Sequence, residues 1–336
     1  MYKIDVVSGF LGAGKTTLIS KLLKEVFPGQ KVVLVENEFG EIGIDGGFLK
    51  EAGIQINEIN SGCICCTLKG DFQKALRQVI DTYHPDHILI EPSGVGKLSD
   101  ILRIVKSVDG TELDSYSTVV DAARCKIYHK NFREFFDDQI ATASCVILSK
   151  TQNVDEQKLA EDTAIIRELN PKARIITTPW DSLSGQAIFD AMKGSSDGFP
   201  AGLGELEDDD DDEEEEEEHE HEHDHEEDHD HDGHEHHHHH HHHHGEHDAD
   251  EVFDSIGMET VTRYDAAQLK QMLNQLGDNI IRAKGIVPDN NGGWLFFDYV
   301  PGEADVRKGT PAVTGLITVI GEHVDEAAMK ALFEVK

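Results

Sequence analysis

Residues 4–19 read Ile-Asp-Val-Val-Ser-Gly-Phe-Leu-Gly-Ala-Gly-Lys-Thr-Thr-Leu-Ile, and this stretch decides the fold. A short apolar run, typical of a buried parallel strand, leads into a glycine-rich loop, after which leucine and isoleucine recur at helical spacing. Gly9, Gly14, Lys15 and Thr16 satisfy the pattern G-x-x-x-x-G-K-[ST], which binds phosphate when a strand precedes it and a helix follows it. Both conditions are met here, so the sequence predicts a P-loop.

The loop supplies the groups that a bound triphosphate needs. Gly9, Gly12 and Gly14 let the backbone approach phosphate closely, so that successive N–H groups and the helix N-terminus face the anion. Lys15 is then expected to reach the β- and γ-phosphates, and the Thr16 hydroxyl to bind Mg²⁺. The alternative, a chance glycine turn before a helix, explains fewer of these residues.

Apolar strands alternate with amphipathic helices as far as residue 193. Because strands that alternate with helices form βα units, we predict a P-loop NTPase domain of the α/β class over residues 1–193, with a parallel sheet and flanking helices. The expected strands are 31–35, 54–59, 87–91, 116–121, 145–150 and 174–178, and the expected helices are 16–26, 71–83, 132–143 and 155–169.

Two of these strands end in residues that suit a nucleotide site, since function collects at the carboxyl ends of parallel strands. The strand 87–91 ends in an acid, and Glu91 can hold Mg²⁺ while the Gly94 N–H senses the γ-phosphate. The strand 31–35 runs into the polar, glycine-punctuated loop 36–45, which is a candidate switch.

Residues 194–254 have the composition of a linker. The 26 acidic residues of 205–251 account for most of the formal charge of −36, which leaves −10 for the rest of the chain. Seventeen of the 21 histidines lie within residues 219–247. This segment is too polar to bury a core, so we expect it to be disordered without metal. Its imidazoles are expected to store or concentrate divalent metal, although a solvated linker that binds metal incidentally is the alternative. The uninterrupted run includes His236, His237, His238, His239 and His240.

Regular structure is predicted again over residues 255–336. Strands are expected at 258–263, 280–286, 293–299 and 314–320, and helices at 265–276 and 325–333. These elements predict a small α+β domain that packs on the first domain.

Cys63, Cys65 and Cys66 place three thiols on a tight glycine turn. Disulfides between such close neighbours would be strained, so in a reducing compartment the thiols are available to metal. Cys63 and Cys65 point the same way in an extended segment and can share one ion. Three thiolates do not fill a tetrahedral zinc shell, and water, Glu36, Glu41 or a histidine of the linker can supply the missing donor. The alternative is that the three cysteines are small buried hydrophobes.

Several classes of protein are disfavoured by composition. No basic cluster indicates a nucleic-acid surface. No stretch of eighteen apolar residues and no signal-peptide pattern occurs, so we expect a soluble cytoplasmic protein without a membrane partner. Cys125 and Cys145 are expected in the core, and the lone histidines His84, His87, His129 and His323 at the surface or at strand ends.

Four segments together resemble the CobW-type P-loop GTPases, namely residues 9–17, 36–45, 62–66 and 91–94. That family includes zinc-transfer metallochaperones, cobalamin-biosynthesis proteins and nitrile hydratase activators, and Cys-x-Cys-Cys is its signature. The resemblance covers residues 1 to about 190 strongly and the segment from 281 onward more weakly. Many members also carry a histidine-rich insert.

The resemblance implies a GTP-hydrolysing metallochaperone that passes a divalent metal, Zn²⁺ before Co²⁺ or Ni²⁺, to a metal-requiring client protein. It makes Glu36 and Glu41 plausible partners of the three cysteines, and it leaves open whether the chain forms a homodimer. It implies that Lys15, Thr16 and Glu91 are catalytic, and that the nucleotide contacts come from Gly9, Gly12, Ala13, Gly14, Lys15, Thr16, Thr17, Gly94, Ser149, Lys150 and Gln152.

One motif departs from the family pattern. Ser149-Lys150-Thr151-Gln152 stands where the guanine-reading Asn-Lys-x-Asp is expected. The Gln152 amide supplies one acceptor but no charge, so base discrimination should weaken, although the stem of Lys150 can still stack on the base. A P-loop ATPase or kinase therefore remains an alternative, as does a passive metal buffer in which the histidines alone act.

Overall fold

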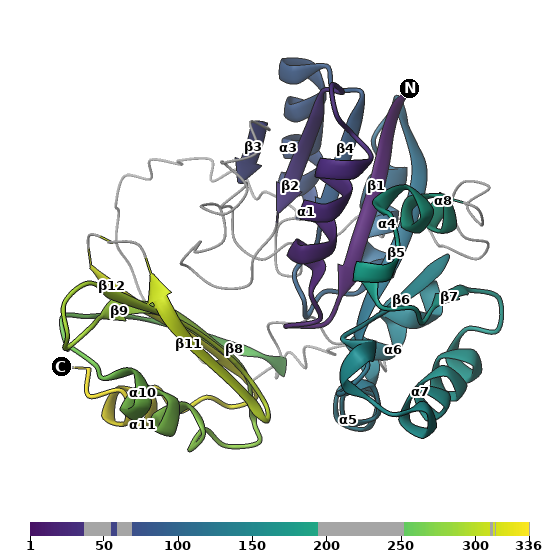
Figure 1. The fold of residues 1–336 in the computed structure, drawn as a ribbon. Coiled ribbons are helices and arrows are strands. Elements are labelled where there is room, and N and C mark those ends of the chain that lie inside the picture. The colour runs from purple at the N-terminus through teal and green to yellow at the C-terminus, as the bar shows by residue number, and fades with distance from the viewer. Residues whose placement is uncertain (37–54, 59–68, 194–251, 310–311, 313, 336) are drawn as a thin grey trace, which may run out of the picture.

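The computed structural model describes residues 1–36, 55–58, 69–193, 252–309, 312 and 314–335. These residues form a seven-stranded sheet in the order β3-β2-β4-β1-β5-β6-β7 and a five-stranded sheet in the order β11-β10-β9-β12-β8 (Figure 1). In the part of the chain that is described, no helix is both long and apolar enough to cross a bilayer.

The first sheet is parallel throughout, as the alternation of strands and helices predicted. The P-loop strand β1 lies between β4 and β5, so polar residues at the carboxyl ends of these strands meet at one edge. The strands are β1 (Tyr2–Gly9), β2 (Val32–Glu36), β3 (Gln55–Glu58), β4 (His87–Glu91), β5 (Thr111–Asp121), β6 (Cys145–Ser149) and β7 (Arg174–Ile176).

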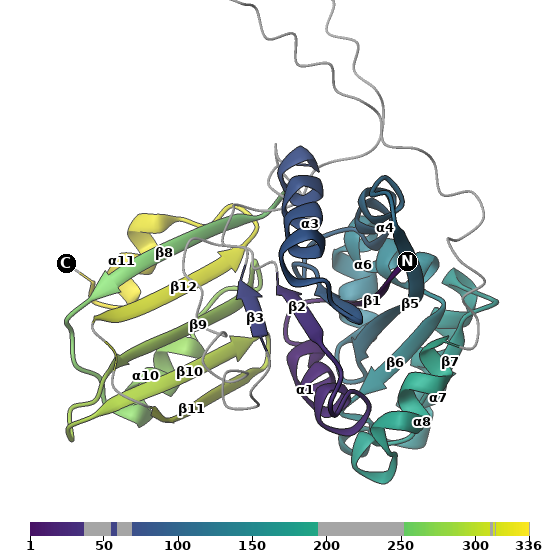
Figure 2. The same ribbon diagram turned by 90° about the horizontal axis from the view of Figure 1, so that it is seen from above.

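Helices cover both faces of this sheet (Figure 2). One face packs on α1 (Lys15–Glu25) and α8 (Gly185–Lys193). The other packs on α3 (Lys69–Tyr83), α4 (Leu98–Lys106), α5 (Cys125–Asn131), α6 (Arg133–Thr142) and α7 (Glu156–Leu169). Side chains of β1 therefore point to both faces of the sheet. Val7 packs with α1 and α8, whereas Ile4 and Val6 pack with the helices of the other face.

Helices α4, α5 and α8 were not among the predicted elements. The starts of α4 and α5 carry no side-chain cap that sequence alone could reveal. All three are short, and packing on the sheet rather than local propensity stabilises such helices.

The second sheet is antiparallel, with α10 (Ala266–Leu273) and α11 (Glu326–Leu332) on one face (Figure 1). Asp265 and Asp325 cap these helices by accepting hydrogen bonds from backbone N–H groups. The predicted strands are present as β8 (Asp254–Thr260), β9 (Ile280–Pro288), β10 (Trp294–Val300) and β12 (Gly315–Gly321), but β8 begins and ends earlier than the predicted range 258–263. The edge strand β11 (Glu303–Gly309) was not predicted, because its charged residues give it no apolar face that periodicity would reveal.

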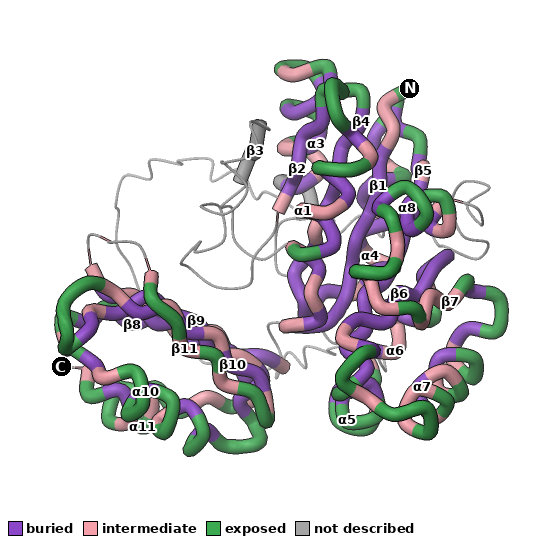
Figure 3. The backbone as a smooth tube through the Cα atoms, in the orientation of Figure 1, coloured by how far each residue is buried: buried purple, intermediate pink, exposed green. Residues whose placement is uncertain are grey.

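The two sheets share a core. Phe253, Ile281 and Ile320 from the second part of the chain are buried in the cluster that contains Phe10 and Phe132 of the first. Figure 3 shows buried backbone running through the strands of both sheets. The second sheet is therefore packed on the first, close to the P-loop.

Candidate nucleotide-binding site

The P-loop connects the end of β1 to the start of α1, as the sequence predicted. Gly9, Gly12 and Gly14 have φ angles of 144°, 70° and 100°, which side-chain-bearing residues rarely adopt. A Cβ atom at Gly9 would lie 2.4 Å from the carbonyl oxygen of Val119 on the neighbouring strand. Gly14 precedes α1 and offers no side-chain cap to its first N–H groups. A loop of this shape exposes backbone donors at a helix N-terminus, which is an arrangement that binds anions.

Lys15 and Thr16 lie where phosphate and Mg²⁺ would bind. Lys15 is 7% exposed, and its ammonium donates to the carbonyl oxygens of Gly9, at 2.9 Å, and Phe10, at 3.4 Å. The Thr16 hydroxyl contacts both carboxylate oxygens of Glu91, at 3.2 and 3.3 Å. Hydroxyl and carboxylate oxygens are the ligands that Mg²⁺ prefers, so the pair fits this ion.

The loop after β4 is held against the P-loop. A Cβ atom at Gly94 would lie 2.6 Å from the Leu11 side chain and 2.9 Å from its backbone nitrogen. The buried amide of Gln139 donates to the carbonyl oxygens of Gly94, at 3.1 Å, and Gly96, at 2.8 Å. Gln139 was not singled out from the sequence, because a lone glutamine on a helix has no pattern. Of the other predicted contacts, Ala13 is buried in the P-loop and Thr17 is exposed on α1.

The candidate base-reading segment follows β6. The Ser149 hydroxyl is buried and donates to the carbonyl oxygen of Val120, at 3.4 Å, whereas Gln152 is exposed. Lys150 adopts a left-handed conformation with φ 55°. Trp180, which the sequence analysis did not identify, lies close enough that a Cβ atom at Gly14 would contact its ring at 3.3 Å. The same Cβ atom would lie 4.0 Å from Cβ of Ser149, so the start of the segment adjoins the P-loop.

Four charged residues join this segment to the second sheet. The Lys150 ammonium lies 3.0 Å from Asp121 and 3.1 Å from Glu303. The Arg124 guanidinium lies 2.6 Å from Asp121 and 3.1 Å from Glu303, and its Nε donates to the carbonyl oxygen of Pro301 at 3.2 Å. Burial opposes ionisation of Glu303, but hydrogen bonds from Lys150 and Arg124 outweigh it and lower the pKa of this carboxyl. No sequence pattern links residues 179 positions apart, so these contacts were missed.

Most of the predicted metal ligands lie outside the described residues, namely Glu41, Cys63, Cys65, Cys66 and His236–His240. Glu36 is the exception. It is the last residue of β2, is half-buried, and stands in register with Glu91 on β4. The one candidate metal donor that can be placed therefore neighbours the carboxylate of the candidate Mg²⁺ site.

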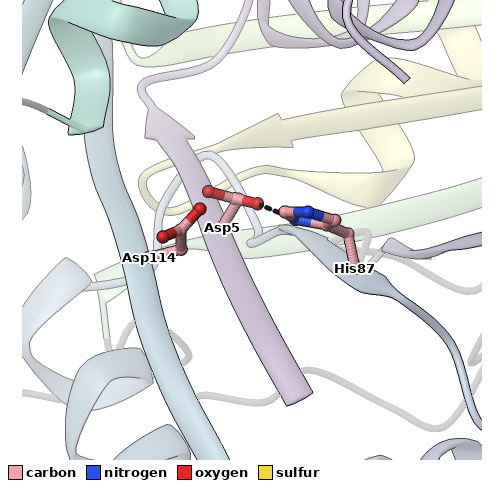
Figure 4. Close-up of side chains that lie close together, drawn as sticks. All are labelled: Asp5, His87 and Asp114. Carbon is pink, nitrogen blue, oxygen red and sulfur yellow. Dashed lines mark hydrogen bonds and ion pairs between the residues drawn. The ribbon is translucent and has the colours of Figure 1, made fainter. Parts of the chain in front are cut away.

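A buried cluster that was not predicted lies at the opposite edge of the same sheet (Figure 4). Asp5, His87 and Asp114 have potential ligand atoms within 4.8 Å of one another, the only such group among the described residues. His87 Nδ1 lies 3.0 Å from Asp5, which also accepts from the Ser115 hydroxyl at 2.6 Å, and Lys193 lies 2.8 Å from Asp114. Because each carboxylate has a protein partner, we interpret the cluster as a closed ion-pair network.

The expectation for lone histidines and buried cysteines holds with one correction. His87 begins β4, as a strand-end residue would, but it is buried rather than exposed, since it packs on Phe27 and pairs with Asp5. His84 and His323 are exposed and His129 is half-buried. Cys125 and Cys145 are fully buried, and burial raises the pKa of both thiols to about 12. Both cysteines are therefore core residues, as the sequence predicted.

Comparison with known proteins agrees with this geometry. The family model of the CobW/HypB/UreG nucleotide-binding domain matches residues 3–177, and that of the cobalamin synthesis protein cobW C-terminal domain matches residues 253–335.

Three curated relatives illustrate the match. The zinc chaperone CobW of Sinorhizobium sp is 35% identical over 185 residues, which cover 46% of this chain and 52% of the relative. The zinc chaperone YeiR of Escherichia coli (strain K12) is 35% identical over 154 residues, covering 45% of this chain and 47% of the relative. The zinc-regulated GTPase metalloprotein activator 1 of Dictyostelium discoideum is 26% identical over 248 residues, covering 60% and 52%. The chain spans about half the length of the curated relatives it matches.

Proposed function

The chain belongs to the CobW/HypB/UreG nucleotide-binding family, and we propose that it hydrolyses GTP and uses the hydrolysis to deliver zinc to a metal-requiring client protein. The observation that carries the proposal is the contact between Thr16 and Glu91 at the mouth of a P-loop that contains Lys15. The relatives' names, zinc chaperone and zinc-regulated GTPase, support the choice of nucleotide and metal.

In this proposal each residue of the site has a defined task. The N–H groups of the loop and of α1 bind the phosphates, and Lys15 exchanges its contacts with Gly9 and Phe10 for contacts with the β- and γ-phosphates. Thr16 and Glu91 hold Mg²⁺, directly or through water, and the ion offsets charge on the phosphates. Lys150 stacks its stem on the base, and the Gly94 N–H senses the γ-phosphate.

The cargo metal is proposed to bind Cys63, Cys65 and Cys66, with Glu36 or Glu41 as a further donor. The position of Glu36 supports a coupling between metal binding and nucleotide binding, because Glu36 at the end of β2 lies beside Glu91 at the end of β4. A change at the γ-phosphate can thereby alter a metal donor through neighbouring strands of one sheet. The histidine-rich linker is proposed to concentrate metal for this site.

The test is the affinity for Zn²⁺ of the full chain loaded either with GDP or with a non-hydrolysable GTP analogue. We expect the two affinities to differ by at least about fivefold, the lower end of typical coupling between sites. Cys65→Ser should abolish the difference, whereas Cys125→Ala, which alters a buried core thiol of α5, should preserve it. Equal affinities in the two states would leave a passive metal buffer as the function.

A second candidate function, a P-loop ATPase, is favoured by one observation. The position that usually supplies a base-reading carboxylate is Gln152, and the Ser149 hydroxyl is engaged by the backbone. Comparing kcat/KM for GTP and ATP separates the two candidates, and a preference for ATP would overturn the GTPase assignment.

A further inference from the structure

The second sheet reaches the P-loop with the end of one strand. A Cβ atom at Gly12 would lie 2.7 Å from Cγ1 of Val300, the last residue of β10. The glycine is therefore required partly because a residue of the other sheet occupies the adjacent space. Any side chain that lies near Val300 on the same face of this sheet is also close to the P-loop.

Lys284 is such a side chain. Ala283, Phe297, Tyr299 and Val319 pack with α10 and α11, so the alternate positions lie on the opposite face, onto which Figure 2 looks from above. Lys284 on β9 pairs with Asp298, two residues before Val300, so Lys284 and Val300 are diagonal neighbours. Diagonal neighbours lie about 7–8 Å apart, within reach of a long side chain.

Lys284 is buried among polar groups, as expected in a ligand-binding site rather than on a protein surface. The residue is only 4% exposed, and Arg282 on the same strand pairs with Asp298 at 3.2 Å. Thr318, in register with Lys284 on β12, is 1% exposed, and its hydroxyl has no hydrogen-bond partner among the described residues. A buried hydroxyl of this kind can be satisfied by a polar ligand.

The charges around Lys284 locate it relative to the phosphates. Burial lowers the pKa of Lys284 to about 8, Asp298 and Glu36 oppose this change, and Lys15 adds to it. Lys284 thus shares one electrostatic environment with the P-loop lysine and with Glu36. Because Glu36 stands beside Glu91, and Glu91 contacts Thr16, this environment is on the Mg²⁺ and γ-phosphate side of the loop.

We infer that Lys284 is a second lysine of the nucleotide site, contributed by the second sheet, and that its ammonium binds the terminal phosphate of a nucleoside triphosphate beside Lys15. The inference rests on the proposed function, because it requires a triphosphate on the P-loop. A diphosphate lacks the group that Lys284 binds, so the contact distinguishes the two nucleotide states. The second sheet then reads the nucleotide directly, and it does so next to the metal donor Glu36.

The experiment measures dissociation constants for GDP and for a non-hydrolysable GTP analogue, both with Mg²⁺, in the full chain. Lys284→Met keeps the length and the apolar stem but removes the charge, so binding of the analogue should weaken about 10- to 100-fold, as expected when a charged hydrogen bond is lost. The affinity for GDP should change less than about twofold. Lys284→Arg should retain part of the preference for the analogue, since it keeps the charge.

Lys308→Met is the matched control, because Lys308 is an exposed lysine on β11 of the same sheet. It should leave both constants unchanged. Thermal unfolding shows whether each variant is folded at the temperature of the binding measurement. Lys284→Gln serves in its place should the Met variant fail to fold.

The outcomes separate this inference from the proposal on which it rests. If the wild type binds neither nucleotide, the proposed function is wrong. If the wild type prefers the analogue and Lys284→Met keeps that preference, the inference alone is wrong. Equal weakening of GDP and analogue would likewise overturn it, because the lysine would then support the whole loop rather than the terminal phosphate.

Discussion

The two edges of the parallel sheet contain buried charges of very different design. At the amino edge, Asp5 and Asp114 are matched by His87 and Lys193 at 3.0 and 2.8 Å, within one domain. At the carboxyl edge the chain places a buried lysine, Lys15, in a loop of glycines with positive φ. The Lys15 ammonium donates to the backbone carbonyl oxygens of Gly9 and Phe10, whereas the carboxylates of the amino edge are held by the side chains of His87 and Lys193.

This difference indicates what each edge does. Removing one partner of a buried charge network destabilises the fold, because the other charge is then left buried without a partner. Burying a cation has a desolvation cost, and such a residue persists where a ligand needs it. Replacing Lys15 of the P-loop should therefore affect activity more than stability, whereas replacing His87 of the amino edge should affect stability more than activity.

The largest effect is expected for Lys15→Met, which should lower kcat/KM for GTP about 10²- to 10³-fold, the usual consequence of deleting one donor to a charged transition state. The free energy of unfolding should fall by no more than about 2 kcal/mol, because the substitution removes the hydrogen bonds to Gly9 and Phe10 but also the desolvation cost of a buried ammonium. Steady-state hydrolysis and urea denaturation measure the two quantities on the same preparations. A large loss of stability would show that Lys15 holds the loop together.

The amino edge should respond in the opposite way. His87→Ala removes the imidazole that hydrogen-bonds the fully buried carboxylate of Asp5, and should lower the free energy of unfolding by about 2 kcal/mol. GTP hydrolysis at 25 °C should change little. His323→Asn, at an exposed position with φ 50°, is the control and should change stability by less than about 0.5 kcal/mol.

Zinc provides a sharper form of this test. If Zn²⁺ raised the stability of the wild type, and His87→Ala alone abolished that increase, the cluster would be a metal site and the contrast between the edges would fail.

The carboxyl edge also contains contacts between the sheets, and Arg124→Met isolates them. Arg124 touches Asp121, Glu303 and Pro301, and Met preserves only the apolar part of its stem. Losing these partly buried charged contacts should destabilise the chain by about 2 kcal/mol. Hydrogen exchange should accelerate in the turn between β10 and β11. Arg307→Met, which breaks an exposed pair with Asp305, should leave exchange in that turn unchanged.

Whether the sequence could predict a feature of either edge depends on how far apart along the chain the contacting residues lie. The P-loop and the alternation of strands and helices follow from local patterns. The meeting of Thr16 with Glu91 follows from them too, because neighbouring parallel strands end at one edge. The network of Asp5 could not be predicted. It depends on a register shift in which β5 inserts Asp114 between the partners of Ile4 and Asp5. Such a bulge is set by packing rather than by periodicity.

The same reasoning explains why the contributions of the second sheet were missed. Lys284 and Glu303 sit on strands whose sequence specifies only local pairing. Their approach to Lys15 and Lys150 depends on how one domain packs on the other, and Phe253, Ile281 and Ile320 fix that packing through the shared core. The pattern of hydrophobic residues predicts which side chains are buried, but it does not predict which other surface they pack against.

The smallest effect is expected from the pH dependence of Glu303. Its pKa is lowered from 4.5 by Lys150 and Arg124 in spite of burial, so the folded state favours the ionised form. The stabilisation is therefore complete above about pH 4.5 and is lost as the pH falls through the lower folded-state pKa. Because the side chain is 52% exposed and screened by salt, the contribution at pH 7 should be only about 0.5 kcal/mol. Glu303→Gln should lower the free energy of unfolding by this amount at pH 7 and should not lower it at pH values below the folded-state pKa, as measured by urea denaturation at each pH.

Asp305→Asn, on the same strand, is the control. A deficit that persists in acid would mean that Glu303 acts through packing, and the ion pairs at the carboxyl edge would then not join the two sheets electrostatically.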